Sequence, residues 1–285
     1  MIHFLNNLFA SCNSDYNSSR YVIFGVPYDA TTTFRPGTRG GPRAIREVSY
    51  NFETYMPSCD INFADLPITD LGDIDTGVIP DGMVSDVFEV VENIIRDGKV
   101  PVMLGGEHSI TTGAVRAARP DCYVVCDAHL DLRGEFRGTP HNHACTTHRV
   151  LEEGVDDIII VGARSGTHEQ FELARSLMLF TADEIHKRGM KPVLEEIQDA
   201  VLKKRMYLSI DADVIDCCLT PGVGTPEPFG LAPQDIRDLI TAIGPQAVAF
   251  DYVEVSPFDH GQTATVAAQM VREFIAVHAK FSIKI

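Results

Sequence analysis

The chain has 285 residues, of which 45% are hydrophobic and 22% are charged, so it has enough apolar side chains for a large globular core. Its formal net charge of −16 argues against a nucleic-acid backbone or an anionic membrane as a partner, and is compatible with metal ions and a cationic small substrate. No apolar run approaches the ~20 residues of a membrane-spanning helix. The 7 cysteines show no disulfide spacing, so we expect reduced, packing thiols in a cytosolic protein.

Predicted strands and helices alternate along the chain. Short apolar, β-branched runs predict strands over Tyr21–Gly25, Ile68–Ile74, Val100–Leu104, Cys122–Val125, Asp157–Val161, Met206–Ile210 and Ala247–Val253. Helices are predicted from Gly41 to Tyr50, from Asp81 to a C-cap at Gly98, over Thr111–Arg119, up to Glu153, and over Thr167–Leu177, Thr181–Gly189, Lys191–Lys204, Pro233–Ile243 and Gln262–Ala279. This alternation predicts a mostly parallel sheet covered by helices on both faces. Because no linker divides the chain, we predict one three-layer α/β/α domain over residues 1–285.

The stretch from Cys122 to Asp131 has the clearest functional pattern. An apolar run is followed by Asp127, His129 and Asp131, which are spaced two apart. In an extended backbone these side chains point to the same side, so three groups that can bind one cation would lie together. Two carboxylates beside an imidazole on an apolar strand are costly unless a positive charge offsets them. The alternative is a surface strand end with solvated charges.

Polar residues follow three further predicted strands: His108, then Asp211 with Asp213, then Glu254. The carboxyl ends of parallel strands line one edge of a sheet, where ligands bind, so we expect these groups to converge. A mixture of carboxylates and imidazoles suits Mn²⁺, Fe²⁺, Co²⁺, Ni²⁺ or Zn²⁺ better than an all-oxygen Ca²⁺ site. The potential ligands are too many for one ion and suit a pair of divalent ions.

Several segments resemble the ureohydrolases, the family of arginase, agmatinase and formiminoglutamase. The three metal-binding motifs of that family resemble Gly105-Gly106-Glu107-His108-Ser109, Asp127-Ala128-His129-Leu130-Asp131 and Ser209-Ile210-Asp211-Ala212-Asp213. The loop Phe34–Pro42, the segment Pro221–Glu227 and the segment Val253–Pro257 also resemble family motifs. Together these matches cover nearly the whole chain in the order of the family. The chain departs from it at Cys217, where a proline is usual, and at Val223 and Phe229.

The resemblance implies an arginase-like fold and two Mn²⁺ per subunit. One ion would be held by His108, Asp127, Asp131 and Asp211, and the other by His129, Asp127, Asp211 and Asp213. A hydroxide bridging the two ions would attack the guanidinium carbon of the substrate, and the intermediate would collapse to urea and an amine. Glu254 matches the glutamate that binds the guanidinium, with an exposed strand-end glutamate as the alternative.

The leaving amine needs a proton from a group that titrates near neutrality, which points to a histidine. The polar segment after Asp131 contains His141, His143 and His148. Because His143 matches the Ser/Asn-His-Ala pattern of the family, we predict that it contacts the substrate and shuttles the proton. His141 is the alternative, and His148 is expected to be a surface or packing residue.

The same segment lacks the asparagine with which arginases hold the substrate and resembles that of agmatinases. We therefore expect agmatine to be hydrolysed to putrescine and urea, a step of polyamine biosynthesis. Glu135 would meet the ammonium end of agmatine, although Arg133 and Arg137 fit this less well. The alternative substrates are N1-aminopropylagmatine, guanidinobutyrate and arginine; the alternative of a different class is a non-catalytic metal-binding subunit. The resemblance also implies a homotrimer or homohexamer, and the cysteine pattern predicts a cytoplasmic location.

Overall fold

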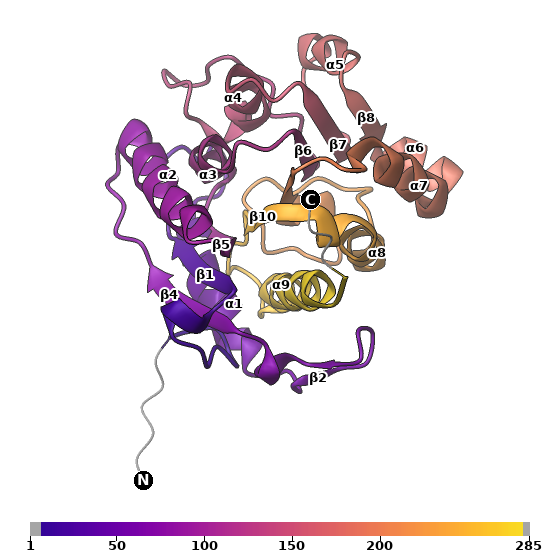
Figure 1. The fold of residues 1–285 in the computed structure, drawn as a ribbon. Helices are drawn as coiled ribbons and strands as arrows, with labels where there is room; N and C mark the ends of the chain where they lie inside the picture. Colours follow the sequence, from indigo (N-terminus) through magenta and orange to yellow (C-terminus); the bar gives the residue numbers. More distant parts are fainter. Residues whose placement is uncertain (1–6, 282–285) are drawn as a thin grey trace.

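Eight parallel strands form the central sheet in the computed structural model, which describes residues 7–281 (Figure 1). The strands are β1 (Tyr21–Val26), β4 (Ile68–Asp73), β5 (Val100–Gly105), β6 (Cys122–Cys126), β7 (Asp157–Ala163), β8 (Met178–Thr181), β9 (Met206–Asp211) and β10 (Ala247–Val253). Their spatial order is β4-β1-β5-β10-β9-β6-β7-β8, and every pairing in this sheet is parallel. All eight carboxyl ends therefore lie at one edge.

Helices cover both faces of the sheet (Figure 1). One face packs against α1 (Gly41–Ser49), α6 (Ala182–Arg188), α7 (Met190–Val201), α8 (Pro233–Ile243) and α9 (Gln262–Phe281). The other packs against α2 (Pro80–Arg96), α3 (Thr111–Ala118), α4 (Thr146–Glu152) and α5 (His168–Ala174). The central strands are apolar throughout because both of their faces are buried. The three-layer α/β/α prediction is confirmed; that residues 1–285 form one domain stays a prediction.

Two strand features were not predicted. Edge strand β8 (Met178–Thr181) has a single buried residue, Phe180, so its sequence lacks the long apolar run of the central strands. The other is a small antiparallel hairpin of β2 (Tyr55–Met56) and β3 (Ile61–Asn62). The Thr181 side chain caps α6, since it accepts a hydrogen bond from the backbone N–H of Glu184.

A buried ion-pair network fastens α1 to edge strand β4. The Arg46 side chain is fully buried, and its Nε and Nη2 donate to the two carboxylate oxygens of Asp70 at 2.8 and 2.9 Å. Arg46 also pairs with Asp73. The backbone N–H of Phe9 donates to Asp70 at 2.6 Å, so the same carboxylate holds the start of the described chain. The charges are thus all paired, as burial demands.

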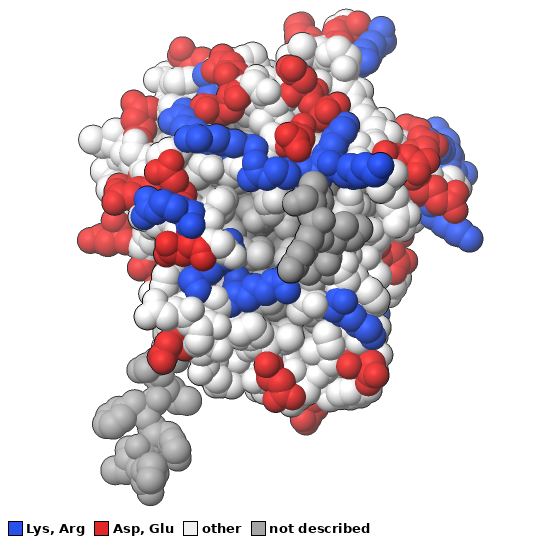
Figure 2. Space-filling view, viewed as in Figure 1, with Lys and Arg blue, Asp and Glu red and all other residues white. Residues whose placement is uncertain are grey.

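The charge distribution on one face is visible in Figure 2. Among the described residues on this face, basic side chains form a row across the middle, and acidic side chains lie around them. Among the described residues, no helix combines the length and the apolar character required to span a bilayer.

Candidate active site

Four neighbouring strands at the centre of the sheet bring the polar residues together. In the order β5-β10-β9-β6, these strands lead into His108, Glu254, Asp211 and Asp127, respectively. The backbone N–H of Glu254 donates to the carbonyl of Gly106 at 2.8 Å, which ties the ends of β10 and β5 together. A Cβ at Gly106 would lie 2.0 Å from the carbonyl oxygen of Tyr28, so only glycine allows this close approach. The predicted convergence at one sheet edge is present.

The first cluster surrounds one nitrogen of His108. Its Nδ1 lies 3.1 Å from Asp127 Oδ2, 3.3 Å from Asp131 Oδ2 and 3.3 Å from Asp211 Oδ2. All four side chains are buried. On the far side of the ring, His108 Nε2 lies 3.1 Å from Ser209 Oγ, which donates to the buried Asp251 carboxylate at 2.6 Å. A hydrogen bond there leaves Nδ1 free to face the carboxylates.

The second cluster surrounds His129. Its Nδ1 lies 3.0 Å from Asp213 Oδ2 and 3.5 Å from Asp127 Oδ1. Asp127 therefore joins the clusters, with one carboxylate oxygen in each. His108, Asp127 and Asp131 offer ligand atoms within 4.8 Å of one another, as do Asp127, His129 and Asp213. That Asp211 belongs to both sets stays a prediction.

These residues fit metal cations. His108 Nδ1 and Asp127 Oδ2 are buried without a hydrogen-bond partner, although they belong to groups that seldom remain unpaired inside proteins. Burial raises the pKa of Asp211 well above its usual range, and the nearby negative charges of Asp213 and Asp127 raise it further. A crowded, buried set of carboxylates with imidazoles is a donor set for divalent transition metals. The donor set therefore supports metal dependence.

The backbone that carries Asp127, His129 and Asp131 differs from the prediction. β6 ends at Cys126, and the segment after it is an irregular turn rather than an extended strand. Asp131 adopts a left-handed φ of 50°, and Glu254 adopts a φ of 62°. Convergence thus comes from a bend and not from strand alternation. Strained backbone of this kind, at about 1–3 kcal/mol per residue, concentrates at functional sites.

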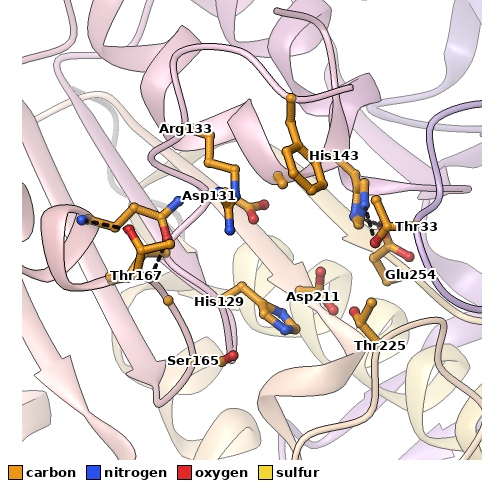
Figure 3. A pocket seen from close by; sticks show the side chains of 15 residues that line it. Thr33, His129, Asp131, Arg133, His143, Ser165, Thr167, Asp211, Thr225 and Glu254 are labelled. Carbon is orange, nitrogen blue, oxygen red and sulfur yellow. Dashed lines mark hydrogen bonds and ion pairs between the residues drawn. The ribbon is translucent and has the colours of Figure 1, made fainter. Parts of the chain in front are cut away.

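A cavity of about 300 Å³ opens beside the two clusters. Figure 3 shows His143, Thr33 and Glu254 close together at one end of it, with Thr167 at the opposite end. The side chains of His129, Asp131 and Asp211 lie between these ends. The cavity thus joins a buried carboxylate, an imidazole and the candidate metal ligands in one space.

A sequence profile of the arginase family matches residues 19–276. The chain belongs to the arginase family. It is 38% identical to the N(1)-aminopropylagmatine ureohydrolase of Thermococcus kodakarensis, over 92% of this chain and 92% of that protein. It is 36% identical to the agmatinase of Pyrococcus horikoshii, over 89% of this chain and 90% of that protein. The crystal structure of an agmatine ureohydrolase of Thermoplasma volcanium matches with a TM-score of 0.93 and 39% identity, covering 98% of this chain and 96% of that chain.

This arginase-family chain places His143 inside the cavity and His141 outside the set of residues that line it. His143 Nε2 lies 3.2 Å from Thr33 Oγ1, and its Nδ1 lies 3.8 Å from Glu254 Oε1. Burial, together with the nearby His129 and His108, lowers the pKa of His143 to about 4, so the ring is neutral at pH 7. This pKa lies below the near-neutral value expected from the sequence. His141 instead contacts Asp81 at 3.2 Å, and His148 lies 3.5 Å from Glu152.

The placement of Glu135 does not support a role at the substrate. Its side chain is exposed and does not line the cavity, whereas Arg133 and Phe136 of the same segment do. A short bridge between Phe136 and Thr139 folds this segment, and the Arg133 guanidinium lies 4.5 Å from the centre of the Phe136 ring. The cavity therefore has a cation, Arg133, where an acidic group was expected.

Three residues that hold the site's side chains in place were not predicted from the sequence. The buried Glu107 accepts hydrogen bonds from the backbone and hydroxyl of Thr31, and Thr31 Oγ1 accepts the backbone N–H of His143 at 3.0 Å. Glu227 lies 3.7 Å from His129 Nε2. Glu107 and Glu227 both lie in segments that resemble family motifs, and this position was the one sequence feature that could have indicated their role.

Proposed function

We propose that this arginase-family hydrolase is an agmatinase, which converts agmatine and water to putrescine and urea in polyamine biosynthesis. The observation that carries the proposal is the pairing of buried Glu254 with His143 in a cavity bordered by the two acidic clusters. The similarity to the Pyrococcus horikoshii agmatinase and to the agmatine ureohydrolase of Thermoplasma volcanium supports it over nearly the full chain.

Glu254 would bind the guanidinium of the substrate. It is only 4% exposed, and burial raises its pKa well above the usual range, with a further contribution from the charge of Glu107. A guanidinium beside it supplies the positive charge that offsets this cost, and the planar cation suits a carboxylate. Oε1 of Glu254 accepts the backbone N–H of His108 at 2.8 Å, which fixes the orientation of the carboxylate.

The residues that would hold two Mn²⁺ are His108, Asp127, His129, Asp131, Asp211 and Asp213. Such a pair supplies a hydroxide nucleophile from water at neutral pH. The protein supplies the arrangement: Ser209 and Asp251 fix the far side of the His108 ring, and Asp213 accepts the backbone N–H of Ala128 at 3.1 Å. These contacts hold the ligands in place before any substrate arrives.

His143 would handle the proton that the leaving amine needs. Because the ring is neutral, it can accept a proton as the guanidinium carbon is attacked and then pass it to the departing nitrogen. Thr33 and the backbone contact to Thr31 hold the ring beside Glu254, the proposed guanidinium ligand. His143 would thus contact both the substrate and the reacting proton.

N1-aminopropylagmatine is the second candidate substrate. It is favoured by the Thermococcus kodakarensis relative, which bears that name and is 38% identical over 92% of this chain. Both candidates contain the same guanidino end, so Glu254 and His143 would serve either. The choice depends on the part of the cavity beyond Glu254 and His143, which Arg133 lines. A cytoplasmic location and a homotrimeric or homohexameric assembly stay part of this proposal.

The test is a comparison of kcat/KM for urea release from four compounds by pure, manganese-loaded protein. The compounds are agmatine, N1-aminopropylagmatine, 4-guanidinobutyrate and arginine. The highest kcat/KM is expected for agmatine. A higher value for N1-aminopropylagmatine would establish the second candidate, and a higher value for 4-guanidinobutyrate would indicate that Arg133 pairs with a carboxylate. No turnover of any of the four would establish a non-catalytic metal-binding protein.

A further inference from the structure

Two adjacent thiols lie on the turn that follows β9, outside the cavity. Asp216, Cys217 and Cys218 offer two Sγ atoms and one carboxylate oxygen within 4.8 Å of one another. Cys218 is exposed and Cys217 is partly exposed, whereas Cys59, Cys122, Cys126 and Cys145 are buried and packed as predicted. All seven cysteines are free thiols. The packing interpretation of the cysteines thus does not extend to this pair.

The turn is held by contacts that leave the thiols available. Cys218 donates its backbone N–H to Asp216 Oδ1 at 2.9 Å, and the N–H groups of Leu219 and Thr220 donate to the Asp216 carbonyl at 2.8 and 3.1 Å. The backbone of the site is therefore ordered before any ligand binds, which reduces the entropic cost of binding. Each oxygen of the Asp216 carboxylate keeps a further lone pair.

We propose that Asp216, Cys217 and Cys218 form a site for a thiophilic divalent cation such as Zn²⁺ or Cd²⁺. Thiolate sulfur prefers soft and borderline cations, and tetrahedral coordination would be completed by water. Two S–H bonds break, two metal–sulfur bonds form and two protons pass to solvent, with no change in oxidation state. Because binding releases the two thiol protons, it strengthens as pH rises.

The same aspartate closes the loop over residues 216–230. Asp216 Oδ2 accepts the backbone N–H of Gly230 at 2.9 Å, and the N–H of Asp216 donates to the carbonyl of Leu231 at 3.0 Å. Within this loop, Thr225 Oγ1 donates to Asp213 Oδ2 at 3.3 Å, and Glu227 lies 3.7 Å from His129. A cation bound to the Asp216 carboxylate draws electron density from the oxygen that accepts the Gly230 N–H, which weakens this hydrogen bond and loosens the loop where it supports the cavity. The filled site therefore inhibits, a consequence that rests on the proposed function.

Binding is tested by titrating the manganese-loaded protein, with its thiols reduced, with Cd²⁺ and recording the ultraviolet thiolate-to-cadmium charge-transfer band. A saturable band is expected for the unmodified protein. It should vanish in the double variant Cys217→Ser with Cys218→Ser and persist in Cys12→Ser, which removes another partly exposed thiol. The carboxylate and imidazole clusters of the cavity give no such band. A missing band, or one that survives in the double variant, overturns the site.

Inhibition is tested on the same proteins with Mn²⁺ in excess. The double variant should keep the basal rate of urea release, because neither thiol lines the cavity. It should resist Zn²⁺ and Cd²⁺ about tenfold better than the unmodified protein, within the usual range of coupling between two sites. Equal inhibition of both proteins would refute the link between this site and the cavity. The charge-transfer band would then still show whether the two thiols bind the cation. Absence of turnover on every guanidino compound would refute the proposed function instead, and the band would still report on the thiols.

Discussion

At the scale of single residues, a buried histidine in this cavity could bind metal or transfer a proton, and the contacts of His143 favour proton transfer. It contacts Thr33 and Thr31 and does not belong to either cluster of potential metal ligands. We expect His143→Ala to lower kcat by about 10²–10⁴-fold, as loss of a general acid–base group does. Its bound manganese, measured by elemental analysis of the purified variant, should equal that of the unmodified protein.

The matched variant is Asp127→Ala. The Asp127 carboxylate has one oxygen facing His108 and the other facing His129, so its removal disrupts both clusters. Metal content and activity should fall together in this variant. If His143→Ala also lost its metal, the separation between the two roles would be wrong.

The sequence predicted which residues meet and not how the intervening chain bends. His108, Asp127, Asp211 and Glu254 were predictable because each lies at or just after the end of a strand, and parallel strands end at one edge. Glu135 lies in an irregular segment, where the direction of a side chain depends on local turns that a sequence pattern does not specify. The role of Asp251 could not be predicted, because this residue lies within β10 and accepts hydrogen bonds from hydroxyl groups on other elements.

At the scale of elements, the alternation of strands and helices predicted the layers, whereas the neighbours of each strand required the structure. Within residues 7–281, β10 is the last strand in sequence, yet it lies between β5 and β9 and brings Glu254 beside His108. Periodicity reports which residues are buried and carries no information about which strand pairs with which. The short β8 was missed because a half-buried edge strand of four residues has little apolar pattern.

The attachment of α1 to β4 gives a stability prediction. Arg46→Ala leaves Asp70 buried without its partner, and breaking such a pair costs about 3–5 kcal/mol of unfolding free energy. The matched control on the same helix is Arg43→Ala. Arg43 forms an exposed pair with Glu47, so its loss should cost less than about 1 kcal/mol. Denaturant unfolding of both variants measures the difference; equal costs would show that the buried pair does not stabilise this edge.

Helix α9 contains a histidine that should weaken the fold in acid. The hydroxyl of Tyr21 lies 2.9 Å from His278 Nδ1, and Nε2 lies 3.2 Å from the carbonyl of Ala247, a pattern that the neutral ring satisfies. Burial lowers the pKa of His278 to about 4, against about 6.5 in the unfolded chain. Between these values the unfolded chain binds the extra proton, so stability falls as pH falls from about 6.5 to about 4.

The test compares His278→Gln with the unmodified protein at two pH values. Glutamine does not titrate, so the gap in unfolding free energy between the two proteins should be wider at about pH 8 than at about pH 5. The expected narrowing is on the order of 2 kcal/mol. Denaturant titration at both pH values measures it, and a gap independent of pH would contradict a neutral, buried His278.

At the scale of the whole molecule, the net charge of −16 includes a buried group of carboxylates at the centre of the sheet edge. The two clusters join residues that follow three strands, β5, β6 and β9, which are distant in sequence, so cations bound there link the middle of the sheet. Such cations bind the folded chain and not the unfolded chain, in which the ligands are scattered. Metal binding is therefore expected to contribute to the stability of the entire fold.

Removal of metal by a chelator should consequently lower the melting temperature. A ligand at about 100 times its Kd stabilises a protein by about 2.7 kcal/mol, which corresponds to a shift of roughly 4–5 °C at this size. Addition of Mn²⁺ should restore the original Tm in a concentration-dependent manner. Asp127→Ala, whose clusters are broken, should melt at the same temperature with chelator as with Mn²⁺. A Tm of the unmodified protein that does not change while elemental analysis shows loss of metal would mean that the clusters bind cations without stabilising the sheet.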